Sequence, residues 1–161
     1  MHRVSRLAPA LPLGVALVLA GSIPSASARS AAPCAKIAPT LDSGASISVG
    51  RFTDRGWVPV ELAGAPVPEG TEISLTIDFH GKVDGHTGCN RITGVAEMDA
   101  GLLVLGPLAI TRMTCTEPRM ALEKAYLDAL SEVVSFAVGL DDNLYLSRAD
   151  GSVALCLRPC R

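Results

Sequence analysis

Aromatic residues and concentrated positive charge are scarce in this 161-residue chain. Phe, Trp and Tyr together make up 4% of the sequence, and 14 lysine and arginine residues against 16 acidic residues give a formal net charge of −2. No basic cluster is present to neutralise a run of phosphates, and the aromatic side chains are too few for a stacking platform that binds single-stranded nucleic acid. We therefore expect no nucleic-acid partner, and the net charge indicates little beyond solubility.

Motifs of several enzyme classes are also missing. There is no Gly-x-Ser-x-Gly turn, and after residue 28 only His80 and His86 remain to act as the base of a catalytic triad. A thiol–disulfide oxidoreductase would carry Cys-x-x-Cys at the start of a helix, and phosphate-binding glycine loops would need a spacing that the glycine turns lack. We expect no catalytic residue, no cofactor and no metal.

The N-terminus has the pattern of a secretory signal peptide. Arg3 and Arg6 precede an apolar run at residues 11–20, and small residues follow up to Ala28. The apolar run is shorter than the roughly 20 residues that a membrane-spanning helix needs. We therefore predict a signal peptide over residues 1–28, cleavage after Ala28, and a mature chain without a transmembrane segment.

The mature chain is predicted to be one domain behind a leader. Its 133 residues fit one domain by the usual range of roughly 100–200 residues, and loss of two arginines leaves 12 basic and 16 acidic residues, a formal charge of −4. Residues 29–50 are rich in Ser, Ala, Pro and Gly and are predicted to be a flexible leader with one edge strand at Ser46–Gly50. The domain then covers residues 51–161. Lipid attachment at Cys34 is the less favoured alternative, because a lipoprotein signal wants a small residue where Pro33 stands.

Alternating apolar residues predict strands on both sides of one helical segment. In Glu72–His80 the residues Ile73, Leu75, Ile77 and Phe79 share one face, which predicts a core face opposite a polar one. Trp57–Leu62 also alternates, and its Pro59 predicts an edge strand. The remaining predicted strands are the segment 83–90, in which Cys89 faces the core, a hairpin of Ile92–Met98 and Leu102–Leu105 around Asp99-Ala100-Gly101, and Val134–Val138, Leu144–Ser147 and Val153–Leu157.

One amphipathic helix is predicted after Pro107. Thr116 can cap it and Pro118 is tolerated in its first turn. The apolar stripe that packs on the sheet is predicted to be Met120, Leu127, Leu130 and Val134, and the charged residues expected on the solvated face are Glu123, Lys124, Asp128 and Glu132. Strands, one helix and further strands predict an α+β fold: a curled, barrel-like antiparallel sheet with the helix packed on it, in a single domain.

Two short motifs carry a family resemblance. Gly88-Cys89-Asn90-Arg91 is followed by Gly106-Pro107-Leu108 and then by Thr111-Arg112-Met113-Thr114-Cys115 just before the helix. This pattern resembles the META domain family, which includes the heat-inducible HslJ-type envelope proteins, over about residues 57–157. The resemblance implies one helix on a strongly bent β layer, a link to stress, and no agreed biochemical mechanism. Ile92 departs from the family, which usually has an aromatic residue there.

Five cysteines in an exported chain predict disulfides, with one thiol left over. Cys89 and Cys115 match the family motif, and on that basis we pair them. Cys34–Cys160 is a weaker prediction, whereas Cys156 is expected to face outward as either the partner of Cys34 or the odd thiol. A free thiol would also permit a disulfide-linked dimer beside the monomer.

The motif side chains leave two interpretations open. Asn90 and Thr111 would hydrogen-bond loop backbone and hold the two motif segments together. Arg91 and Arg112 would lie on one rim and capture a carboxylate or an acidic partner segment. A zinc site built from His86-x-x-Cys89, Cys115 and His80 is a weak alternative, because His86 and Cys89 point to opposite faces of a regular strand.

The sequence therefore favours an exported, non-enzymatic binding module, periplasmic or secreted, whose partner is an unknown protein or an envelope component. Two other classes stay open. Rigid, disulfide-tied loops would suit a small protease-inhibitor-like module. A thiol redox protein would need Cys89 or Cys115 as a free, reactive thiol.

Overall fold

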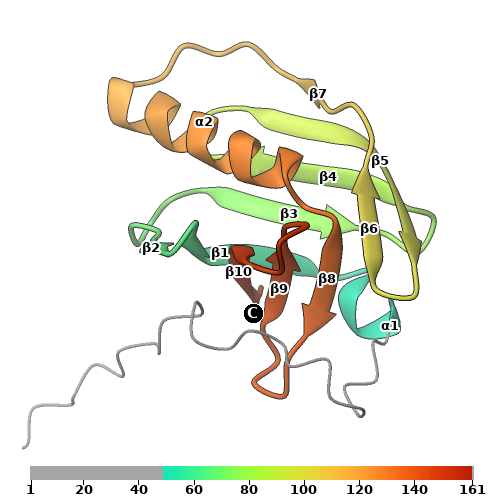
Figure 1. Cartoon of the computed structure of the whole chain (residues 1–161). Coiled ribbons are helices and arrows are strands. Elements are labelled where there is room, and N and C mark those ends of the chain that lie inside the picture. Colours follow the sequence, from blue (N-terminus) through green and yellow to red (C-terminus); the bar gives the residue numbers. More distant parts are fainter. Residues whose placement is uncertain (1–48, 161) are drawn as a thin grey trace, which may run out of the picture. The chain divides into compact units, whose positions relative to one another are not determined.

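Eight antiparallel strands form a closed barrel in the computed structural model, which describes residues 49–160 (Figure 1). In order around the barrel they are β1 (Gly56–Leu62), β3 (Ile73–Ile77), β4 (Lys82–Thr87), β5 (Arg91–Asp99), β6 (Leu102–Leu105), β8 (Ser135–Val138), β9 (Leu144–Ser147) and β10 (Val153–Pro159). The barrel closes because β10 pairs with β1. Two-residue strands lie off this ring: β2 (Ala65–Pro66) pairs with β1, and β7 (Ala109–Ile110) pairs with β5. The predicted α+β class with a curled antiparallel sheet is confirmed.

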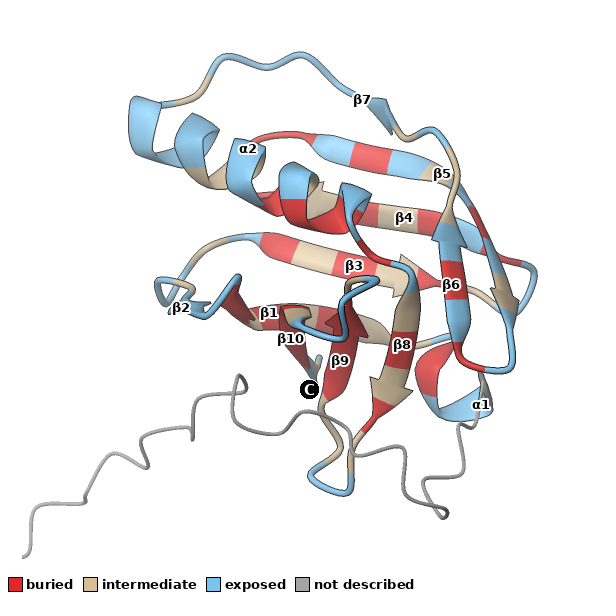
Figure 2. Ribbon diagram, viewed as in Figure 1, coloured by how far each residue is buried: buried red, intermediate tan, exposed pale blue. Residues whose placement is uncertain are grey.

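Alternation along the strands produces one core inside the barrel, visible as alternating burial along β3 and β5 (Figure 2). Ile73, Leu75 and Ile77 are buried as predicted. Phe79 is 69% exposed, so its predicted place on the core face is wrong. The strand ends at Ile77 because Asp78 starts a turn in which its carboxylate accepts the backbone N–H groups of His80 and Lys82, each at 2.8 Å.

Strand β1 has a more central place than predicted. Trp57 and Pro59 are buried, whereas Val58 and Val60 are only partly buried. β1 pairs with both β3 and β10, so it is no edge strand. Pro59 is tolerated because the register against β10 is irregular between Pro59 and Glu61, where the strand pairing leaves room for a residue without an N–H.

The predicted hairpin after the Cys89 motif is confirmed, with β5 running from Arg91 to Asp99. Its turn residues Ala100 and Gly101 both have positive φ angles, 45° and 91°, as the two central residues of a type I′ turn require. Later in the chain β9 has the predicted bounds, β8 begins one residue later than expected at Ser135, and β10 extends to Pro159.

The predicted helix is α2 (Glu117–Ser131), which packs against β1, β4 and β10. Thr116 occupies the N-cap position, although its side chain makes no capping hydrogen bond. The fully buried residues are Tyr126, Ala129 and Leu130, all in the second half of α2, and Leu122 and Leu127 are partly buried against the core. Met120 is 37% exposed and Val134 lies beyond the helix end at 39% exposure, so both are wrongly placed in the predicted stripe.

The described residues begin with a short helix, α1 (Val49–Phe52), so the last two residues of the strand predicted at Ser46–Gly50 are helical, and the first three lie outside the described range. Phe52 is buried, stacks on Phe136 with ring centroids 4.5 Å apart, and accepts a hydrogen bond from the Trp57 indole at 2.9 Å. The predicted signal peptide, its cleavage at Ala28, Cys34 and the leader up to residue 48 lie outside the described residues. Within residues 49–160 no helix is long and apolar enough to cross a bilayer.

Candidate functional site

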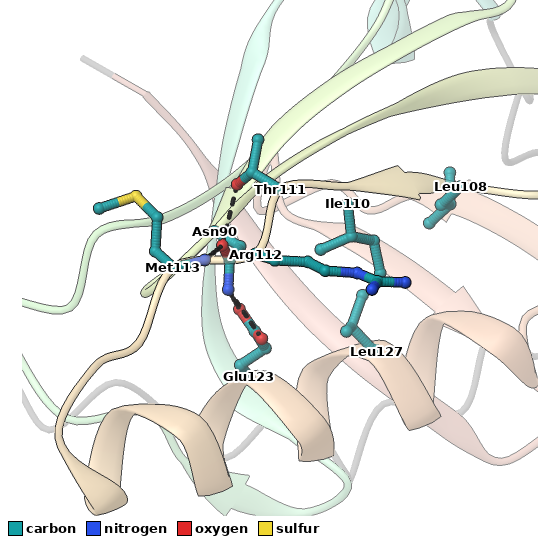
Figure 3. A pocket seen from close by; sticks show the side chains of 8 residues that line it. All are labelled: Asn90, Leu108, Ile110, Thr111, Arg112, Met113, Glu123 and Leu127. Atoms are coloured by element: carbon teal, nitrogen blue, oxygen red, sulfur yellow. Dashed lines mark hydrogen bonds between the residues drawn. The ribbon is translucent and has the colours of Figure 1, made fainter.

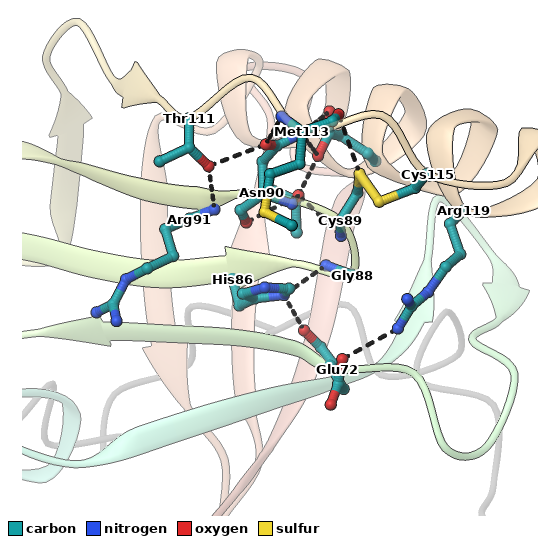
Figure 4. The surroundings of a disulfide bond; sticks show 12 residues. Glu72, His86, Gly88, Cys89, Asn90, Arg91, Thr111, Met113, Cys115 and Arg119 are labelled. Carbon is teal, nitrogen blue, oxygen red and sulfur yellow. Dashed lines mark hydrogen bonds and ion pairs between the residues drawn. A yellow bond between two sulfur atoms is a disulfide. The ribbon is translucent and has the colours of Figure 1, made fainter.

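A disulfide joins the two motif cysteines and fixes the start of α2 to the barrel (Figure 4). Cys89 follows β4, and Cys115 lies two residues before α2; their Cα atoms are 6.0 Å apart, within the ordinary range for a bridge. Gly88, the residue before Cys89, has a φ angle of 92°, a left-handed conformation that favours glycine. The predicted Cys89–Cys115 pairing is confirmed, and it brings the two motif segments together.

Asn90 links these segments through its side-chain amide. Its Oδ1 accepts hydrogen bonds from the Thr111 hydroxyl at 2.9 Å and from the Met113 backbone N–H at 2.7 Å. Its Nδ2 donates to both carboxylate oxygens of Glu123, at 3.1 and 3.0 Å. The Thr111 hydroxyl in turn accepts the backbone N–H of Arg91 at 3.0 Å. The structural interpretation of Asn90 and Thr111 therefore holds.

Glu123 belongs to this network, which corrects its predicted place on a solvated helix face. Besides Asn90, the Thr87 hydroxyl bonds to its carboxylate. Thr87 is fully buried and its hydroxyl also accepts the Asn90 backbone N–H at 2.8 Å. Sequence spacing gave no sign of this role, because it depends on the disulfide that places the first turns of α2 over Asn90. Lys124 and Asp128 do form an exposed pair on the outer face, at 2.6 Å.

The two arginines predicted to share a rim line different cavities. Arg91 forms an exposed ion pair with Asp84 at 3.0 Å and lines a cavity of ≈ 360 Å³ beside Lys82. Arg112 makes no ion pair or hydrogen bond with any residue in the described part of the chain. It lines a second cavity of ≈ 490 Å³ on the α2 side, together with Asn90 and Glu123 (Figure 3).

The cavity at Arg112 continues into a third cavity of ≈ 450 Å³. Both are lined by Leu108, Ile110 and Leu127, and the third extends towards Leu105 and Leu130. We call the two together the α2 groove, which lies between the segment 105–113 and α2. One end is polar, with Asn90, Thr111, Arg112 and Glu123, and the other end is apolar.

The other cysteines differ from their predicted pairing. Cys160 is exposed and carries a free thiol, so the predicted Cys34–Cys160 bridge is wrong. Cys156 is disulfide-bonded, so it is not the odd thiol. It faces away from the barrel core, as predicted, because its neighbours Leu155 and Leu157 belong to the main core whereas Cys156 does not, but it is fully buried there. Tyr145 stands opposite Cys156 on the neighbouring strand β9. The two side chains pack together in a small cluster outside the main core.

The residues of the zinc alternative are engaged elsewhere. The sulfurs of Cys89 and Cys115 are bonded to each other, and Nδ1 of His86 donates to the Glu72 carbonyl oxygen at 2.7 Å. His80 precedes β4 whereas Cys89 follows it, so the strand separates them. No group of three or more potential ligands is found among residues 49–160.

Perturbed pKa values occur away from the α2 groove. Burial and a 2.6 Å hydrogen bond to Asp141 raise the pKa of Tyr145 to about 12. Burial would raise the pKa of Asp141, but hydrogen bonds from Tyr145 and Asn143 outweigh it and lower that pKa. Burial also raises the pKa of Tyr126, whose hydroxyl is buried without a hydrogen-bond partner in the described structure.

Similar structures agree with this fold. A protein from Burkholderia xenovorans, solved by NMR, is 28% identical with a TM-score of 0.57, covering 69% of this chain and 85% of that one. A second NMR structure is 24% identical with a TM-score of 0.53, and the match covers 70% of this chain and 94% of that one. A DUF4847 family protein from Bacteroides vulgatus is 14% identical (TM-score 0.51; 66% and 93% covered). The last two show the fold alone. No curated protein matches significantly.

The fold and site define a small closed antiparallel barrel whose motif loops are tied to one helix by a disulfide and an Asn–Glu network. The META domain family model matches residues 50–159. The chain belongs to the META domain family.

Proposed function

We propose that this chain is an exported, non-enzymatic binding domain of the periplasm or the secreted fraction, which holds a protein or an envelope component in the α2 groove and acts in the stress response. The groove supports this proposal most directly. It lies where the family motif, the disulfide and α2 meet, and it contains Arg112, which has no ion-pair or hydrogen-bond partner among the described residues. Export and stress rest on the signal-peptide pattern and on the resemblance to heat-inducible relatives.

The absence of a catalytic role is inferred from how the motif residues are used. Asn90, Thr111 and Glu123 satisfy one another and the loop backbone, and both motif sulfurs are held in a disulfide. General acid–base or nucleophilic chemistry needs a reactive group beside a base that can take its proton. Side chains committed to a structural network are better suited to shaping a groove than to reacting in it.

Photo-crosslinking in the living cell tests the binding face. A crosslinking amino acid at Met113, which lines the groove, is expected to yield a discrete adduct in the exported protein. The matched control is Leu140, which is fully exposed on the β8–β9 connection. The adduct should disappear with Arg112→Glu. Equal labelling at both positions, or an adduct insensitive to that change, would contradict binding through this groove.

Intact-mass analysis of the exported protein tests the targeting part of the proposal. The expected chain begins at Arg29, without lipid. A lipid on Cys34 would instead place the protein on a membrane surface, and an uncleaved chain in the cytoplasm would contradict export.

A further inference from the structure

Arg112 is an exposed cation beside an apolar surface, and no acidic residue of positions 49–160 forms an ion pair with it. Among the lysine and arginine residues of positions 49–160, the ones outside any ion pair are Lys82, Arg112 and Arg158. Of these, only Arg112 lines the α2 groove. Its guanidinium lies near Ile110 and Leu127, two of the three residues shared by the polar and apolar ends (Figure 3). A guanidinium in such a position presents a fork of N–H donors that matches a carboxylate.

Glu123 does not neutralise this arginine. Its carboxylate oxygens are directed to the Asn90 amide and the Thr87 hydroxyl, and no ion pair joins it to Arg112. The negative charge at this polar end also disfavours a ligand with several anionic groups, because like charges repel at short range. A ligand with one carboxylate therefore fits the charge of the groove better than a polyanion does.

The apolar end determines what is attached to that carboxylate. Beyond Arg112 the lining side chains are chiefly Leu and Ile with Pro107, and Ser131 is the only one with a side-chain hydroxyl. A peptide would bring backbone N–H and C=O groups that need hydrogen-bond partners, and these side chains offer almost none. An aliphatic chain has no such requirement and gains from leaving water.

We propose that the α2 groove binds an aliphatic monocarboxylate of the fatty-acid type, with its head group on Arg112 and its chain along Leu108 and Leu127 towards Leu105 and Leu130. This inference rests on the proposed binding role of the groove and names the class of ligand. The two cavities, ≈ 490 and ≈ 450 Å³, are each large enough for a medium-length chain.

Decanoate, decanol and octanoate are suitable probes, followed by ¹⁵N-resolved NMR on the exported protein below their aggregation concentrations. Decanoate should shift the amide signals of Ile110, Arg112 and Leu127 and bind at least tenfold more tightly than decanol. Octanoate, which lacks two methylenes, should bind about 16-fold more weakly than decanoate, because each methylene contributes about fourfold.

Arg112→Gln should abolish the preference for decanoate over decanol while the spectrum stays that of a folded protein, because Arg112 has no partner to lose. The matched control is Arg158→Gln, an exposed and unpaired arginine on β10, which should keep the preference. Equal binding of decanoate and decanol, shifts confined to another face, or an unchanged preference in Arg112→Gln would overturn the inference. A groove-specific crosslink at Met113 in that case would leave the binding role intact with a different ligand.

Discussion

At the scale of single residues, Asn90 shows how one side chain can account for a motif. Its amide has one acceptor oxygen and two donor hydrogens, and the structure engages both ends, with Thr111 and Met113 of the segment before α2 on the oxygen and Glu123 of α2 on the nitrogen. Aspartate at this position would turn the two donors into an acceptor facing the Glu123 carboxylate. The amide is therefore needed for its polarity, not only for its tolerance of turn geometry.

Replacement of Asn90 by alanine should lower the free energy of unfolding by about 3 kcal/mol, because hydrogen bonds to a charged carboxylate, to a hydroxyl and to a backbone N–H are lost together. Urea denaturation of the two proteins measures the difference. Thr93→Ala is the control, since Thr93 is exposed on β5 and should change stability by less than about 0.5 kcal/mol. A loss below about 1 kcal/mol for Asn90→Ala would show that the network is dispensable.

The Tyr145 hydroxyl makes stability depend on alkaline pH. Because the pKa of Tyr145 is raised to about 12 in the folded state and tyrosine in an unfolded chain titrates near 10, its contribution is complete below about pH 10. It should be lost as pH rises from about 10 to 12, where only the unfolded state ionises. Tyr126 is expected to change stability with pH in the same direction, since burial raises its pKa too.

Tyr145→Phe should therefore show a shallower loss of stability over this alkaline range than the unchanged protein does. Chemical denaturation at several pH values between 9 and 12 gives the two slopes. Identical slopes would mean that the hydroxyl of Tyr145 is not protected from ionisation. The lowered pKa of Asp141 affects stability at acidic pH. Its contribution to the free energy of unfolding is present above about pH 4 and is lost as the pH falls further.

At the scale of elements, α2 is held at its two ends by different means. Its second half is anchored by Tyr126 and Leu130 in the core, whereas its first turns depend on the Cys89–Cys115 bridge and on the Asn90–Glu123 contact. Removal of the disulfide should therefore act unevenly along one helix.

Cys89→Ala together with Cys115→Ala should lower the free energy of unfolding by about 3 kcal/mol, as expected for a bridge that closes a loop of this size. Hydrogen exchange should also show that amides around Glu117–Glu123 lose protection while β8, β9 and β10 keep theirs. Cys160→Ser, which alters a free thiol, is the control and should change neither quantity. Uniform loss of protection across the barrel would contradict separate anchoring of the helix ends.

The element scale also shows how far sequence patterns carry. Ile73, Leu75 and Ile77 were predictable because alternation is a local property of a strand, and the Ala100-Gly101 turn was predictable from its residue types. The prediction that Phe79 lies in the core was wrong, because Asp78 ends the strand through its own hydrogen bonds. The prediction that Glu123 lies on the solvated face was wrong for a different reason. Its partners are 33 and 36 residues away in the sequence and are brought near by a disulfide, and helix periodicity does not contain this information.

At the scale of the whole molecule, the exposed thiol of Cys160 is expected to set the oligomeric state in oxidising conditions. Cys160 is exposed near the end of the chain, where its backbone N–H is bonded to Gly56 at 2.8 Å. We expect air-oxidised protein to contain a dimer that reducing agent dissociates, and Cys160→Ser to remain monomeric. Non-reducing electrophoresis with light scattering checks both, and a dimer that persists in Cys160→Ser would point to a non-covalent interface.

Because β1 pairs with β10, the barrel can close only after β10 has been synthesised. The strand that begins at Gly56 and the strand that ends at Pro159 are neighbours, so nearly all of the described residues lie between these two partners in the ring. Synthesis delivers β10 last, and until then β1 lacks one of its two flanking strands. A barrel of this kind stays open until β10 has left the ribosome, so the chain remains without its closed core for most of the time in which the domain is made.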